Sequence, residues 1–172
     1  MAMKQLDPKA VWLFFISNFF SLFFIFLILG FYLLAFISSL NLGISFVVVI
    51  GIILLLIFPF TAFIMAKLSY KYYFYSLTED GFRKEYGIIW KKYVTIPYDR
   101  IQNIDMLRGP VARILGLSDL QIQTAGASAQ VTRHGVFGAG AEGRLPGLSK
   151  DIAEKLRDEL LQKVRTSKNQ GL

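Results

Sequence analysis

The sequence has no cysteine, a single histidine, and no charged residue over a long stretch near its start. The absence of cysteine excludes disulfides, thiolate catalysis and thiolate metal sites. Any His-based triad or metal cluster would depend on His134 alone, which lies in a glycine-rich segment where loop surface is the commoner role. We therefore expect a protein without catalytic residues, cofactor or metal, and not an enzyme.

The uncharged stretch runs from Ala10 to Ala66 and is dominated by Phe, Leu, Ile and Val. About 20 apolar residues suffice for one helix to cross the hydrocarbon core of a bilayer. The stretch therefore predicts a hairpin of two transmembrane helices, one at about 11–37 and one at about 44–66, with the polar dip at 38–43 as the turn. A cleaved signal peptide is the alternative, but its apolar region would be much shorter.

Lysines flank the predicted hairpin and set its orientation. Lys4 and Lys9 precede the first helix, Lys67 and Lys71 follow the second, and the connecting turn carries no charge. Basic residues stay on the cytoplasmic side, so we expect a multi-pass protein of the cell membrane with both termini in the cytoplasm.

Three polar residues interrupt the first predicted helix. Ser17 and Ser21 share a face at the four-residue helical spacing, and Asn18 lies next to them. Small and amide side chains favour helix packing in membranes, and we assign this role to all three. The alternative is a transport pathway, but such a pathway normally carries ionisable groups, which this stretch does not contain.

After Lys67 the composition is that of a soluble domain. Alternating and aromatic patterns predict short strands, with turns at glycine and proline, and a polar-faced helix from Ser149 to about Thr166. The expected strands are 72–77, 82–86, 90–96, 101–107 and 118–124. The Gly/Ala-rich segment 125–147 predicts one or two weak strands around a loop, and 167–172 a flexible tail. The fold class is a membrane helical hairpin followed by an α+β domain.

Several of these segments together resemble one family. They are Tyr75–Gly81, Gly87–Lys92, Ile96–Gln102, Gly109–Leu117 and Thr124–Gly126, with the opening Leu6–Ala10. This set resembles the bacterial and archaeal PH-domain membrane proteins (bPH2, also called DUF304 or YdbS-like). The resemblance implies a cytoplasmic PH-like barrel, a bent antiparallel sheet capped by a C-terminal helix, at 67–166. The segment 1–10 and the hairpin 11–66 precede it.

The net charge of +7 points to an anionic partner. A basic domain tied to a bilayer has lipid head groups as its nearest anions, so we expect membrane lipids as partners and no nucleic acid. In eukaryotic PH domains, basic residues of the early strands hold inositol phosphates. By this resemblance, Arg83, Lys84, Lys91 and Lys92 are the corresponding candidates here. A solvated basic face is the alternative. The set is Lys67, Lys71, Arg83, Lys84, Lys91, Lys92, Arg108 and Arg113.

Two hypotheses follow for function. The first is a non-enzymatic, membrane-anchored PH-like module that binds protein partners and forms homo-oligomers, or hetero-oligomers with a related PH-domain membrane protein, with its basic face on anionic lipid. The second is a subunit or accessory of a membrane pore or transporter whose hairpins oligomerise.

Overall fold

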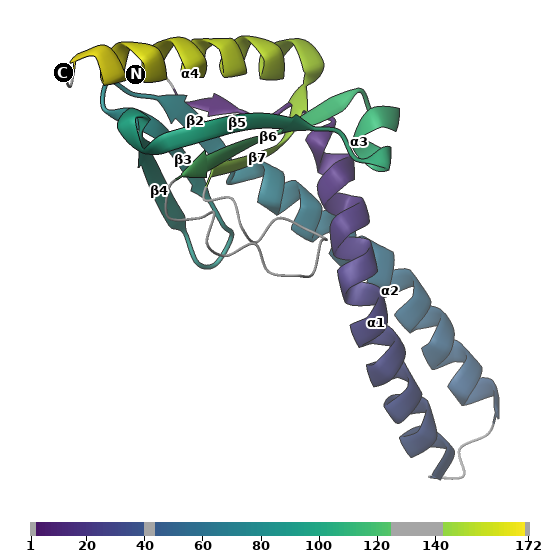
Figure 1. The fold of residues 1–172 in the computed structure, drawn as a ribbon. Helices are drawn as coiled ribbons and strands as arrows, with labels where there is room; N and C mark the ends of the chain where they lie inside the picture. Colours follow the sequence, from purple (N-terminus) through teal and green to yellow (C-terminus); the bar gives the residue numbers. More distant parts are fainter. Residues whose placement is uncertain (1–2, 40–43, 125–142, 171–172) are drawn as a thin grey trace. The chain divides into compact units, whose positions relative to one another are not determined.

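A computed structural model describes residues 3–39, 44–124 and 143–170 (Figure 1). The chain divides into two compact units, one formed by residues 1–10 together with 70–172 and the other by 11–69. The first unit is therefore discontinuous in sequence, and the second is inserted into it.

The inserted unit is the expected helical hairpin. Helix α1 covers Ala10–Ser39 and α2 covers Ile44–Lys71, so α2 extends past the predicted end at 66. Spans with the length and hydropathy of membrane helices run over Ala10–Ile37 and Val48–Lys71, and few of their side chains are buried within the chain. Such an open apolar surface is what lipid covers in a membrane protein.

Aromatic rings join the two helices of the hairpin. The ring of Phe58 on α2 has its centroid 4.6 Å from that of Phe19 and 5.0 Å from that of Phe26. Ala62 and Ala66 are fully buried, and their small side chains let the helices approach. α2 continues through Pro59, and the hydroxyl of Thr61 donates to the carbonyl oxygen of Phe58 at 2.8 Å.

The discontinuous unit begins with a four-stranded antiparallel sheet in the order β1-β2-β3-β4. Strand β1 is Lys4–Gln5, β2 is Phe74–Leu77, β3 is Gly81–Tyr86 and β4 is Lys92–Pro97. β4 begins two residues later than the predicted strand because Trp90 belongs to the turn. Nothing in the short polar segment before the hairpin predicted β1, whose Lys4 pairs with Tyr75 and whose Gln5 pairs with Phe74.

A three-stranded sheet completes the barrel in the order β5-β6-β7. The 3-10 helix η1, Tyr98–Arg100, leads into β5, Ile101–Leu107; α3, Pro110–Ile114, leads into β6, Leu117–Thr124; and β7 is Gly143–Ser149. The predicted strands 101–107 and 118–124 are thus present. The last strand lies at the end of the Gly/Ala-rich segment, and the rest of that segment, with His134, lies outside the described residues.

Helix α4, Lys150–Gln170, runs across one side of the two sheets (Figure 1). It buries Ala153, Leu156, Leu160 and Val164 against the core, whereas Ile152 and Leu161, expected in the same stripe, remain 45% and 37% exposed. The helix also continues beyond the predicted end at Thr166, whose hydroxyl donates to the carbonyl oxygen of Gln162 at 3.0 Å. No helix breaker precedes Gly171, so the predicted tail at 167–170 is helical.

Candidate functional site

Three of the predicted basic residues gather where the chain leaves the second span. Lys71 is the last residue of α2, and Lys91 and Lys92 lie at the start of β4. The Nζ atoms of Lys71 and Lys91 lie 5.8 and 5.9 Å from the centroid of the Tyr72 ring, which places the ring within range of both cations. All three lysines are exposed. We call Lys71, Lys91 and Lys92 the basic edge.

A small hollow lies beside the basic edge, with a volume of about 50 Å³. Aromatic rings form most of its wall, and it is too small for more than a water molecule or a methyl-sized group. Its lining residues are Tyr72, Phe74, Glu85, Tyr86, Gly87, Lys91 and Tyr93. The basic edge is therefore a surface and not a closed ligand pocket.

Lys84 and Arg83 differ from the expectation of a head-group-facing surface. Lys84 is only 4% exposed, its Nζ donates to the carbonyl oxygen of Arg144 at 3.3 Å, and it lies 4.9 Å from the centroid of the Tyr86 ring. Burial, and then the positive charges of Arg144 and Lys92, lower the pKa of Lys84 to about 8. Arg83 faces the other side of β3 and pairs with Glu85 at 2.9 Å.

Several buried polar groups of the barrel contact Arg144, a residue that the sequence did not single out. Arg144, at the start of β7, pairs with Asp119 of β6 at 2.5 Å, and its carbonyl oxygen also accepts a hydrogen bond from the Tyr73 hydroxyl at 2.7 Å. Asp119 in turn accepts from the backbone N–H of Gly147 at 3.1 Å. Burial raises the pKa of Tyr73, which keeps its hydroxyl a donor. The sequence signal that could have indicated this ion pair lies in β6, where the charged Asp119 stands between Ser118 and Leu120, which are both buried.

Replacing Lys84 by methionine should stabilise the domain at neutral pH by about 2 kcal/mol. The substitution removes a buried charge worth about 3 kcal/mol and forfeits one hydrogen bond worth about 1 kcal/mol, while Tyr73 still satisfies the Arg144 carbonyl. The folded pKa of about 8 lies below the ordinary 10.5, so the wild-type chain should gain stability as the pH rises between these values.

Pulse proteolysis of the full chain in detergent micelles, across a urea series at pH 7 and pH 10, measures this difference. The gain from Lys84→Met should be large at pH 7 and small at pH 10, and Lys155→Met on the exposed surface of α4 should show neither. An equal effect of Lys84→Met at both pH values would contradict the buried-charge interpretation.

The remaining predicted residues do not join the basic edge. Lys67 belongs to the hairpin unit, where its Nζ lies 5.0 Å from the centroid of the Phe63 ring. Arg108 and Arg113 flank and occupy α3, which Figure 1 shows well away from β4, and Arg108 Nε donates to the carbonyl oxygen of Leu117 at 3.2 Å. Within the PH-like unit, the predicted residues are therefore divided among separate groups.

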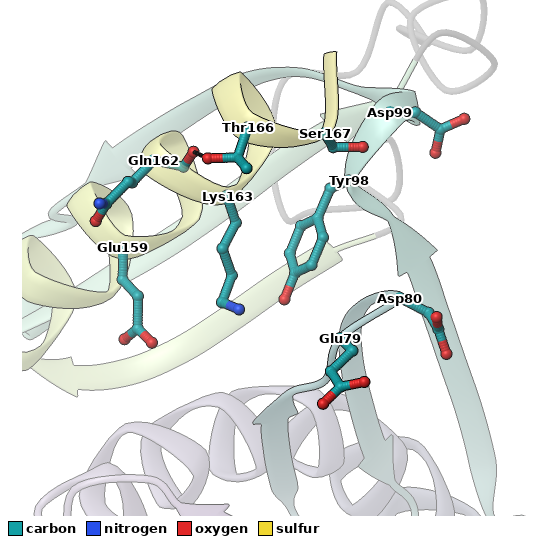
Figure 2. Close-up of a pocket in the computed structure, with 9 residues that line it drawn as sticks. All are labelled: Glu79, Asp80, Tyr98, Asp99, Glu159, Gln162, Lys163, Thr166 and Ser167. Atoms are coloured by element: carbon teal, nitrogen blue, oxygen red, sulfur yellow. Dashed lines mark hydrogen bonds between the residues drawn. The ribbon is translucent and has the colours of Figure 1, made fainter. Parts of the chain in front are cut away.

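A second hollow is acidic and lies elsewhere in the barrel, between α4, η1 and the β2–β3 turn (Figure 2). Its volume is about 510 Å³, and Figure 2 shows the Lys163 side chain beside Tyr98, whose ring centroid is 5.5 Å from Nζ. Burial, with the nearby Glu159, raises the pKa of Tyr98 to about 12, and its hydroxyl donates to the Thr78 carbonyl at 2.8 Å. The carboxylates around it are Glu79, Asp80, Asp99 and Glu159.

This acidic hollow has polar walls but lacks a metal-binding arrangement. Among the described residues, no three His, Cys, Asp or Glu side chains come together closely enough to hold a metal ion. The sole lysine of its lining is engaged with the Tyr98 ring. With four carboxylates around one lysine, the hollow would repel anionic ligands.

Comparisons with known proteins place the chain among membrane proteins with this domain. The model of the bacterial PH domain family matches residues 12–164. The chain is 28% identical over 119 residues to the UPF0699 transmembrane protein YdbS of Bacillus subtilis (strain 168), which is 69% of this chain and 66% of YdbS. It is 31% identical over 96 residues to the UPF0699 transmembrane protein YdbT of the same organism, which is 56% of this chain and 17% of YdbT.

No solved structure matches the chain. The chain spans slightly less than two thirds of YdbS and a minor part of YdbT. Both relatives are named as transmembrane proteins, in agreement with the two apolar helices found here.

Proposed function

Since this chain belongs to the bacterial PH domain family, we propose that it is a non-enzymatic, membrane-anchored PH-like module that contacts anionic lipid head groups at the cytoplasmic face. We propose further that it assembles with copies of itself or with a related PH-domain membrane protein. The observation that carries the lipid contact is the basic edge, because Lys71 ends the span and Lys91 shares the Tyr72 ring with it. Each lysine near an anionic surface contributes about 1 kcal/mol.

The pairing of β1 with β2 supports the orientation. β1 precedes the hairpin and β2 follows it, so both ends of the hairpin must lie on the same side of the membrane for Lys4 to pair with Tyr75. The lysines at both ends favour the cytoplasmic side as that side.

The outer face of α1 supports assembly through the hairpin. Ser17 and Ser21 are exposed and Asn18 is partly exposed, so within one chain the serine pair does not pack against α2. Small polar residues four apart are typical of helix contacts in membranes, and a second hairpin would cover them. The same face would serve the pore or transporter alternative, and the measured stoichiometry bears on both.

Native mass spectrometry of the full chain, released from bilayer nanodiscs with equal phosphatidylglycerol and phosphatidylcholine, tests both parts at once. We expect a mass of two or more chains, and retained phosphatidylglycerol in excess of phosphatidylcholine. The double variant K91E/K92E should reduce that excess about tenfold. A loss of about 1.4 kcal/mol in binding free energy lowers affinity tenfold, and reversing two charges should cost at least that much.

The matched control is K155E/R165E, which makes the same change of net charge on exposed positions of α4. It should leave the lipid preference near the wild-type value. A single-chain mass without lipid preference would overturn the proposed function, and equal effects of the two double variants would show that net charge alone attracts the lipid.

A further inference from the structure

The turn between β3 and β4 exposes two large apolar side chains next to the basic edge. Ile89 is 81% exposed and Trp90 is 85% exposed, and Lys91 and Lys92 follow them directly. An apolar pair of this size in water has lost the burial that normally stabilises such residues, about 1.5–3 kcal/mol for each side chain. Exposure of both at one turn indicates a partner surface.

The backbone holds this turn in a defined shape. Tyr86 of β3 pairs with Lys92 of β4, which closes the segment 87–91. Gly87 has φ +111°, and a Cβ atom there would overlap the carbonyl oxygen of Trp90. A side chain at position 87 is therefore excluded, and the tight turn carries Ile89 and Trp90 at its tip and does not let them fold back.

The chain connection keeps this turn close to the membrane. Lys91 at the end of the turn contacts the ring of Tyr72, and Tyr72 follows directly after Lys71, the last residue of the second span. Consecutive Cα atoms are about 3.8 Å apart, so the Cα atom of Tyr72, whose ring the turn contacts, lies one such step from the end of the span.

We propose that Ile89 and Trp90 insert into the interfacial region of the bilayer that anchors the chain. Tryptophan favours this region because its ring is apolar and its N–H remains hydrogen-bonded, and isoleucine gains the burial that it lacks in water. The occupant is lipid, because the apolar tip, the adjacent lysines and the end of the span are continuous with one another. The insertion deepens the proposed function and rests on the position of the domain at the membrane face.

Tryptophan fluorescence of the full chain tests the insertion directly, because the sequence contains only two tryptophans, Trp12 and Trp90. In W12F the wild-type Trp90 is the sole reporter, so no change at the tip itself is needed. The chain is reconstituted in vesicles of phosphatidylcholine and phosphatidylglycerol, with and without bromine on the acyl chains. Trp90 emission should be blue-shifted, and brominated lipid should quench it.

Two variants calibrate the quenching. In W90F the remaining Trp12, at the start of the first span, gives the value for an interfacial residue. In W12F/W90F/L161W the reporter lies on α4, at a position where Leu161 is 37% exposed. Quenching of Trp90 should be close to that of Trp12 and severalfold greater than that of L161W.

Either of two results would overturn the insertion. Solvent-like emission without quenching would leave the tip in water, and blue-shifted emission without quenching would identify protein, such as a second copy, as the cover. The result is separable from the lysine test. Quenched Trp90 with no effect of K91E/K92E removes the head-group contact alone, and unquenched Trp90 with a strong K91E/K92E effect removes the insertion alone.

Discussion

Replacing Asp119 by alanine should destabilise the PH-like domain by about 3 kcal/mol, the largest effect we expect from a single side chain outside the hairpin. Asp119 is 7% exposed and holds both the Arg144 guanidinium and the N–H of Gly147. Its removal leaves a cation and a backbone donor without their acceptor. The value lies at the lower end for buried pairs because the Arg144 side chain keeps 28% of its surface in solvent.

The urea midpoint of the full chain in detergent micelles, read by pulse proteolysis, should fall by about 2 M for D119A. D119N should lie between D119A and wild type, since the amide oxygen still accepts from Gly147 but carries no charge. The matched control is D158A on α4, where the carboxylate pairs with Arg157 at 3.1 Å but is 66% exposed, and it should cost below about 0.5 kcal/mol. Similar losses for D119A and D158A would contradict a structural role for the Arg144 pair.

Replacing Gly147 by alanine should cost about 2–3 kcal/mol and should loosen the segment before the hairpin. Gly147 has φ +67°, and a Cβ atom there would lie 2.5 Å from the Cβ of Ala10. Its carbonyl oxygen also accepts from the N–H of Asp7 at 3.2 Å. The free-energy costs of the strained dihedral and of the steric overlap add together. The overlap is with the N-terminal segment that carries β1, so we expect that segment to loosen.

Gly116 provides the matched control, since it has φ +71° and nothing within 4 Å of the added atom. G116A should therefore show only the dihedral cost, about 1 kcal/mol. Hydrogen exchange of the backbone amides of Leu6, Asp7 and Lys9 should accelerate in G147A and stay unchanged in G116A. Equal urea midpoints and equal exchange in the two variants would show that the N-terminal segment is not held by β7.

The sequence predicted the parts of the fold that depend on local pattern. The uncharged run specified two spans because a bilayer imposes the same length requirement on every helix. The aromatic run ending at Leu77 and the glycine at position 81 specified the β2–β3 hairpin because turn chemistry is local. The periodic stripe of α4 gave its buried face, although Ile152 and Leu161 at the margins of the stripe are exposed.

The remaining features depend on contacts between distant residues. β1 has two polar residues, and only its pairing with Phe74 and Tyr75 makes it a strand. Ile101 and Ile104 are both buried despite their odd spacing, because a register shift between Ile101 and Asn103 resets the alternation of β5. Lys84 was expected on the surface because nothing in its neighbourhood reveals a carbonyl that lies 60 residues away.

The same limit applies to the candidate site. Lys71, Lys91 and Lys92 could be named from the sequence, but the convergence of Lys71 and Lys91 on one tyrosine ring required the fold. Trp90 was expected at the start of the strand 90–96, and the structure places it in a tight turn at 85% exposure. This exposure is what supports the proposed insertion.

The insertion of the hairpin between β1 and β2 also fixes an order of events during synthesis. A ribosome makes β1 first, then both spans, and only afterwards the strand that β1 pairs with. A chain in which only one of the two spans inserts across the membrane would hold β1 and β2 on opposite sides of the bilayer. The edge of β2 would then stay unpaired and could pair with a strand of another chain. Closure of the barrel therefore reports that membrane threading has been completed.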